Sequence, residues 1–190
     1  ILRPTGQKLS KRAGDPSFED LVSMGYLPEA IVNYIALLGW SPGTTQEIFS
    51  LEELEEQFTI EGISKSPAIF DIKKLIWLNG EYIRILPLED FNRLAMLYYK
   101  GAIKNENIDF MKLSKVLQLR TEVLSSIPEN VDFIDNLPEY ETSLYVHKKM
   151  KTDENVSLAS LKTALPVLEE LQTWDETVIH DALISLAGEM

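Results

Sequence analysis

The sequence contains no cysteine among its 190 residues, which excludes a disulfide framework, a thiolate zinc site and a cysteine nucleophile. Long hydrophobic runs are also missing, because the longest apolar stretches, such as residues 35–38, are far too short to cross a bilayer. Residues 1–8 carry charges that no apolar stretch follows, so they do not form a signal peptide. We therefore expect a protein of the reducing cytoplasm, without a membrane partner.

Positive charge is scarce and unevenly placed. The chain has 18 Lys and Arg against 30 Asp and Glu, which gives a net charge of −12. Residues 1–12 carry four of the cations and no acid, which leaves −16 for the rest of the chain. A basic footprint for nucleic acid is therefore absent from the chain as a whole. The basic start fits a local phosphate contact, and a frayed terminus on an acidic body is the alternative interpretation.

The hydrophobic pattern predicts an all-α protein. Apolar residues recur at helical spacing almost throughout, and no strand-length alternation bounded by turn signals competes with them. Capping and proline signals predict where the helices begin, namely at Asp15–Pro16, Pro28, Ser50 (a capping box with Glu53), Asp71, Leu88, Asp109, Ser157 and Asp175. Predicted ends include Gly25, Gly39, Asn79–Gly80, Lys100, Ser126 and Gln172. We further expect Tyr34, Trp40 and Trp77 in the core, and Asn33 and Asn79 to bind loop backbone.

One short segment concentrates positive charge. Residues 6–15 read Gly-Gln-Lys-Leu-Ser-Lys-Arg-Ala-Gly-Asp, with Lys8, Lys11 and Arg12 inside five residues and a glycine on either side. Glycine hinges let such a loop open and close. Two lysines aimed at one place suit a polyphosphate that must later leave. Basic pentapeptides are common, however, so this pattern by itself is weakly specific.

Three motifs in order give the segment its context. Residues 8–12 (KLSKR) resemble the KMSKS-type signature loop of class I aminoacyl-tRNA synthetases, in the form found in glutamyl-tRNA synthetases. Residues 25–41 (GYLPEAIVNYIALLGWS) and 70–83 (FDIKKLIWLNGEYI) are similar to two segments that follow in that family. The resemblance to bacterial-type glutamyl-tRNA synthetases is dense over residues 1–86 and thinner beyond. Ala13 departs from the pattern, since the family commonly has His there.

The resemblance implies a division into four parts. These are the signature loop (1–15), a helical stem-contact domain (16–87) and two helical anticodon-binding subdomains (88–143, and 144–190, incomplete). It also implies that the catalytic Rossmann domain, with its HIGH motif, is absent from this chain, because neither His147 nor His180 lies in such a motif. The closing Pro-Leu-Arg of the family does not occur either. We therefore expect an internal piece of a glutamate–tRNA ligase, inactive by itself.

The resemblance also implies roles for residues of the loop. In the parent reaction, the glutamate carboxylate attacks the α-phosphate of ATP and pyrophosphate leaves, with Mg²⁺ present in the intact enzyme. Lys8, Ser10 and Lys11 are then the catalytic residues: Lys11 contacts an ATP phosphate, Lys8 supports it and Ser10 is a neutral donor. The implied partners are tRNA(Glu), ATP and L-glutamate, with a monomer expected and the loop mobile in the isolated chain. Whether the enzyme also charges the glutamine tRNA stays open.

Residues that contact tRNA are harder to assign. Single-stranded loops are read by stacking on aromatic or Arg side chains and by hydrogen bonds to base edges. Candidates are Arg120, Tyr98, Tyr99 and the late basic cluster Lys148, Lys149 and Lys151. The alternative for Arg120 is a helix-surface ion pair with Glu122 or a more distant acid, and the alternative for the lysines is a solvated face.

Two further questions concern metal binding and the type of partner. We expect no metal site, since the two histidines are isolated and the acids at 52–56 are typical of a solvated helix face. A helical protein-interaction module without RNA binding is the alternative function. It is supported by the −16 body, which repels RNA unless basic groups are clustered.

Overall fold

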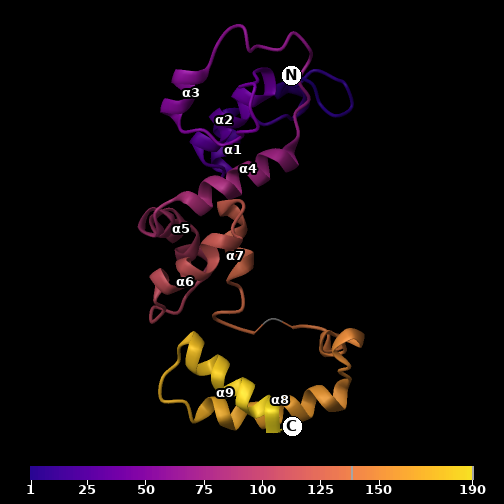
Figure 1. The fold of residues 1–190 in the computed structure, drawn as a ribbon, viewed down its shortest axis with the longest axis vertical. Coiled ribbons are helices and arrows are strands. Elements are labelled where there is room, and N and C mark those ends of the chain that lie inside the picture. Colours follow the sequence, from indigo (N-terminus) through magenta and orange to yellow (C-terminus); the bar gives the residue numbers. More distant parts are fainter. Residues whose placement is uncertain (138, 190) are drawn as a thin grey trace. The chain divides into compact units, whose positions relative to one another are not determined.

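The computed structural model describes residues 1–137 and 139–189, and it consists of helices joined by turns and loops (Figure 1). The described residues contain isolated β-bridges and no strand, which confirms the all-α prediction. The chain divides into a first unit, residues 1–137, and a second unit that follows it. Pro138 and Met190, which fall in the two predicted anticodon-binding subdomains, lie outside the described residues.

The first unit contains seven α-helices and three short 3₁₀ turns within its described residues. The helices are α1 (Phe18–Ser23), α2 (Pro28–Gly39), α3 (Leu51–Gln57), α4 (Ile72–Ile85), α5 (Leu88–Ala102), α6 (Phe110–Leu117) and α7 (Ile127–Asn130). The 3₁₀ turns are η1 (Lys11–Ala13), η2 (Gln118–Arg120) and η3 (Leu124–Ser126). The second unit has η4 (Thr142–Tyr145), η5 (Lys148–Met150), α8 (Glu154–Glu169) and α9 (Glu176–Glu189).

Several helix starts lie where local capping signals predict them. Pro28 occupies the first turn of α2, where its missing N–H costs nothing. Ser50 and Glu53 form a reciprocal capping box on α3. The Asp71 carboxylate accepts hydrogen bonds from the first amides of α4, and Asp175 accepts one from the Val178 N–H at 2.9 Å. Each of these four signals involves only residues in or beside the first turn of its own helix.

Two predicted starts are wrong. Helix α1 begins at Phe18 with Ser17 as its cap, because Asp15 is already bound to Arg3 by hydrogen bonds. Helix α8 begins four residues earlier than predicted, with Asp153 as its cap. Ser157 instead lies inside that helix, and its hydroxyl donates to the Tyr145 carbonyl oxygen at 2.7 Å.

Two predicted ends are also wrong. Helix α4 continues through Asn79–Gly80 to Ile85, because the Asn79 side chain is buried and bound rather than free to cap a helix end. Helix α6 ends at Leu117 instead of 126. The Gln118 amide that follows donates to the carbonyl oxygens of Ile83 and Leu86 at the end of α4. The chain then leaves the helix at Thr121 to pack against the first helices of the unit.

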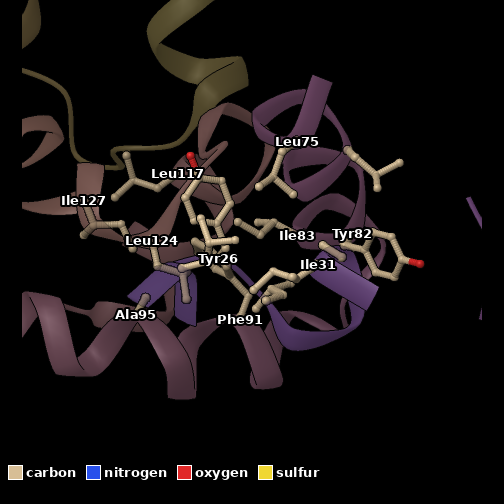
Figure 2. Packing of buried hydrophobic residues seen from close by; sticks show 14 of the residues in the cluster. Tyr26, Ile31, Leu75, Tyr82, Ile83, Phe91, Ala95, Leu117, Leu124 and Ile127 are labelled. Atoms are coloured by element: carbon tan, nitrogen blue, oxygen red, sulfur yellow. The ribbon is translucent and has the colours of Figure 1, made fainter. Parts of the chain in front are cut away.

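Buried apolar side chains from α2, α4, α5, α6, η3 and α7 form the main core of the first unit. Figure 2 shows Ile31, Leu75, Ile83, Phe91 and Leu117 converging with others of the cluster from these separate helices. Burial of such side chains away from water is the dominant favourable contribution to folding. The core therefore joins residues 18–85 and residues 88–131 into one packed body.

The aromatic predictions gave mixed results. Tyr34 and Trp40 are buried as predicted, and Trp40 packs with Phe49 and Leu54 in a smaller second cluster. Trp77 is 40% exposed, so the prediction that it packs in the core is wrong. It lies on the face of α4 away from the core residues Leu75 and Leu78.

Two buried asparagines tie loops to helices, as predicted. The Asn33 carbonyl oxygen accepts the Phe49 N–H at 2.9 Å and the Tyr82 hydroxyl at 2.7 Å. Asn79 accepts the Leu27 N–H at 2.7 Å and donates to the Glu122 carbonyl oxygen at 2.6 Å. Burial raises the pKa of Tyr82 to about 12, so its hydroxyl stays protonated.

The second unit differs from the first in how far its side chains are buried. Between residues 139 and 188, no side chain is as buried as those of the first core. Pro166 lies inside α8, where it removes one backbone donor. Across the described part of both units, no helix has the length and apolar content needed to span a membrane.

Candidate functional site

The basic segment begins on a narrow hairpin. The backbone N–H of Arg3 donates to the Gln7 carbonyl oxygen at 2.7 Å, and the Gly6 N–H donates to the Arg3 carbonyl oxygen at 2.8 Å. The Leu2 N–H also donates to the Ala68 carbonyl oxygen, and the Leu2 carbonyl oxygen accepts the Phe70 N–H, each at 2.8 Å. The hairpin is therefore anchored to the residues that lead directly into α4.

Arg3 and Asp15 close the base of the loop that follows. The Arg3 guanidinium donates to both Asp15 carboxylate oxygens at 2.9–3.0 Å and to the Ala13 carbonyl oxygen at 2.7 Å. Asp15 also accepts the Ser10 N–H at 2.7 Å. We call this arrangement the Arg3–Asp15 clamp. It joins the hairpin, the start of the loop and its end at one point.

The clamp sets the ionisation of its carboxylate. Hydrogen bonds from Arg3, and then from the Ser10 N–H, hold the pKa of Asp15 below its usual range. A lowered pKa means that the clamp is complete at neutral pH and opens only as the pH falls through that lowered value. Gly14, inside the loop, adopts a left-handed φ of 83°, a conformation that glycine adopts without a steric cost.

The residues implied in catalysis lie on the outer side of this clamped loop. Lys8, Ser10 and Lys11 are all exposed, and Lys11 opens the turn η1. Among the described residues, neither lysine forms an ion pair. An open hollow of about 570 Å³ lies beside the loop, with Ala13 and Asp15 among its lining residues. Lys8, Ser10 and Lys11 do not line this hollow, so the loop presents its exposed lysines outside it.

We predict that Asp15→Asn loosens this loop at neutral pH. The neutral amide loses the charge-assisted bonds to Arg3, which are stronger than bonds between neutral groups. Hydrogen exchange at the Ser10 and Gly14 amides should become faster, while exchange in α4 stays unchanged. Asp20→Asn, which removes a carboxylate from the cap of α1 and leaves the Arg3–Asp15 bonds in place, is the matched control. Equal exchange at Ser10 in the variant and the wild type would contradict the clamp.

The candidates for tRNA contact in the first unit differ in how exposed their side chains are. Arg120 ends η2 and is exposed, and the described residues offer it no ion pair with Glu122. Tyr99 is fully buried, its hydroxyl lies 3.1 Å from that of Ser114, and its ring stacks on Phe110. The suggestion that Tyr99 stacks on a base is therefore wrong. Tyr98 is half-buried, and burial raises its pKa.

Lys148, Lys149 and Lys151 lie together on a closed turn in the second unit. His147 and Thr152 exchange backbone hydrogen bonds at 3.2 and 3.3 Å, and the His147 ring accepts the Met150 N–H at 3.2 Å. All three lysines are exposed. We call residues 147–152 the basic turn. Its hydrogen bonds hold three positive charges within four positions of the chain.

Sequence reasoning missed the Arg3–Asp15 clamp entirely. The two residues are twelve positions apart, and no short-range pattern signals such a pair. In residues 1–137 and 139–189, no three histidine or acidic side chains lie close enough together to bind a metal ion. Glu53 serves α3 as a capping residue.

Comparison with known families places two domain models along the chain. Residues 1–77 match the model described as tRNA synthetases class I (E and Q), catalytic domain. Residues 87–190 match the model of the anticodon-binding domain. The basic loop lies in the first match, and Arg120 and the basic turn lie in the second.

Individual proteins agree with these matches. The glutamate–tRNA ligase of Clostridium tetani is 57% identical over the whole chain, and that of Clostridium kluyveri is 52% identical. The chain spans 39% of the length of each. A crystal structure of a glutamate tRNA ligase from Elizabethkingia meningosepticum, in complex with its amino acid, superposes with a TM-score of 0.78 at 24% identity. This similarity covers all of this chain and 41% of that one, and it supports the fold.

Proposed function

The chain belongs to the glutamate–tRNA ligase family of class I aminoacyl-tRNA synthetases, and on this basis we propose that it serves as the tRNA-binding part of such an enzyme together with its ATP-contacting loop. One observation carries the proposal: a catalytic-domain match containing the exposed basic loop is followed in the same chain by an anticodon-binding domain. The parent enzyme would activate glutamate with ATP and transfer it to tRNA(Glu). This chain alone would not.

The loop would act on the leaving phosphates of ATP. When the glutamate carboxylate attacks the α-phosphate, negative charge grows on the departing pyrophosphate, and donors aimed at that charge lower the barrier. Lys11 would contact a phosphate, Lys8 would add a second positive charge and Ser10 a neutral donor. The clamp supports this role because it fixes both ends of the loop while its cations stay exposed.

Magnesium would enter with the ATP substrate. The described residues of this chain do not fit a site for it, since no cluster of carboxylates gathers among them. We therefore assign no step to the metal ion. We also infer that the parent enzyme works in the cytoplasm as a monomer.

The anticodon-binding part would hold RNA through some of its exposed cations. Arg120 lies on the first unit, and Lys148, Lys149 and Lys151 lie on the basic turn of the second. Clustering matters here because the body of the chain is acidic and repels RNA elsewhere. The anticodon-domain match favours this reading over a protein-interaction module without RNA binding.

We predict a steep salt dependence for tRNA(Glu) binding by the 190-residue chain. Neutralising about three to four phosphates gives a slope of roughly −2 to −4 in log K against log salt. Replacing Lys148, Lys149 and Lys151 with Glu should remove about two units of this slope. Lys162→Glu, on the exposed surface of α8, is the control. Fluorescence anisotropy at several salt concentrations measures all of these constants.

Two results would contradict this function. One is the absence of tRNA binding at low salt, and the other is equal affinity for a DNA duplex of the same length. Either result would favour the protein-interaction alternative.

A further inference from the structure

A cavity in the second unit has no part in the roles assigned so far. It has a volume of about 310 Å³ and lies between η4 and the first turns of α8, both drawn in orange in Figure 1. Its lining residues are Thr142, Tyr145, Glu154, Ser157, Leu158 and Leu161. This volume is at the lower end of the range for small-molecule sites. An aromatic ring, two aliphatic side chains and a carboxylate together suit a flat, polar-edged ring.

The aromatic wall of the cavity is held in place. The Tyr145 carbonyl oxygen accepts the Ser157 hydroxyl at 2.7 Å, which ties the end of η4 to α8. The Tyr145 hydroxyl lies 2.8 Å from that of Tyr140, and the two rings meet edge to face with centroids 5.9 Å apart. Tyr145 remains 36% exposed. A ring fixed at both its backbone and its hydroxyl can stack on a ligand with little loss of freedom.

Glu154 supplies a hydrogen-bond acceptor at the same cavity. It is the first residue of α8, and capping of that helix is already done by Asp153, whose carboxylate accepts the Val156 N–H at 2.9 Å. The Glu154 carboxylate forms no hydrogen bond or ion pair with the described residues. A free carboxylate accepts hydrogen bonds from an exocyclic amine such as N4 of cytosine.

The basic turn begins and ends beside this cavity. His147 follows Tyr145 by two residues, and Thr152 precedes Glu154 by two residues. Two residues span at most about 7 Å, so both ends of the turn lie close to cavity residues. Lys151 adopts a left-handed φ of 55°, which is uncommon for a residue other than glycine. The turn is therefore a constrained carrier of three cations at the rim of the cavity.

We propose that the cavity holds one unstacked nucleotide of single-stranded RNA. Tyr145 stacks on the base, with Leu158 and Leu161 beneath it. Glu154 accepts a hydrogen bond from an amine on the edge of the base. Lys148, Lys149 and Lys151 meet the flanking phosphates. This inference rests on the proposed tRNA-binding function, and it adds the residues that would contact a base.

Fluorescence anisotropy with the 190-residue chain and labelled RNA hexamers tests the pocket. Hexacytidylate should bind more tightly than hexauridylate, because uracil has no exocyclic amine for Glu154, and Glu154→Gln should reduce this preference. Tyr145→Ala should weaken binding of both hexamers by about 5- to 100-fold, the usual effect of removing one base-stacking ring. Tyr145→Phe, which keeps the ring, should bind within about threefold of the wild type.

Trp174→Ala is the matched control, because Trp174 is 67% exposed in the same unit and does not line the cavity. Binding of tRNA(Glu) is measured in parallel with every variant. Equal hexamer affinity for Tyr145→Ala and Trp174→Ala overturns the pocket, while salt-dependent tRNA binding by both leaves the proposed function standing. Failure of the wild-type chain to bind tRNA at low salt overturns the function itself.

Discussion

We expect Lys11→Ala, in a full-length protein that carries this chain, to lower the rate of ATP–pyrophosphate exchange by about 10²- to 10³-fold, the usual effect of removing one donor to transition-state charge. The structure gives the physical reason. Lys11 is exposed at the start of η1, and the Arg3–Asp15 clamp holds the backbone on both sides of it. Affinity for tRNA(Glu) should stay nearly the same, because the anticodon-binding match lies elsewhere in the chain.

A matched control separates this effect from a general loss of charge. Lys65→Ala removes an exposed lysine from another loop of the same unit. Its exchange rate should equal that of the wild type. An unchanged exchange rate for Lys11→Ala would remove Lys11 from the reaction, even if the family membership of the chain stands.

The second large effect concerns stability. Gly25→Ala should lower the free energy of unfolding of the first unit by about 2–5 kcal/mol, because strain and a backbone clash combine. Gly25 has a φ of 92°, and a Cβ atom there would lie 2.6 Å from the Ser125 nitrogen. The Gly25 carbonyl oxygen also accepts the Leu124 N–H at 3.1 Å. Urea unfolding followed by tryptophan fluorescence measures the loss.

The background and the control make this measurement specific. In a Trp174→Phe background, the two remaining tryptophans, Trp40 and Trp77, both report on the first unit. Gly43→Ala is the control, since Gly43 has a φ of 72° and open space where its Cβ would be placed. It should cost only the strain, about 1 kcal/mol. Equal losses for Gly25→Ala and Gly43→Ala would show that the contact with Ser125 contributes nothing.

Local signals predicted a large part of the fold. Asp71 and the pair Ser50–Glu53 cap helices where their spacing indicates, because a cap needs only the first turn of its own helix. Predictions failed where a distant residue competes for the same group. Asp15 binds Arg3 instead of capping α1, and the Asn79 side chain bonds to residues 27 and 122 instead of ending α4.

For the candidate site, too, local motifs predicted some residues, and others depend on contacts between distant residues. The resemblance of residues 8–12 to a known signature implies roles for Lys8, Ser10 and Lys11 that stay predictions, and the structure adds the clamp that closes their loop. Tyr99 was a reasonable candidate for stacking on a base, yet it is buried by packing that helical spacing alone does not reveal. Tyr145 gave no sequence signal, because its position depends on a hydrogen bond to α8 and on a second tyrosine.

We propose that this chain holds the tRNA-reading part of a glutamate–tRNA ligase. The most direct measurement is a salt titration of its binding to tRNA(Glu), compared with the same tRNA carrying a substituted anticodon. We expect salt-sensitive binding that weakens when the anticodon is changed. Absence of binding to either tRNA at low salt, or identical affinity for both, would contradict it.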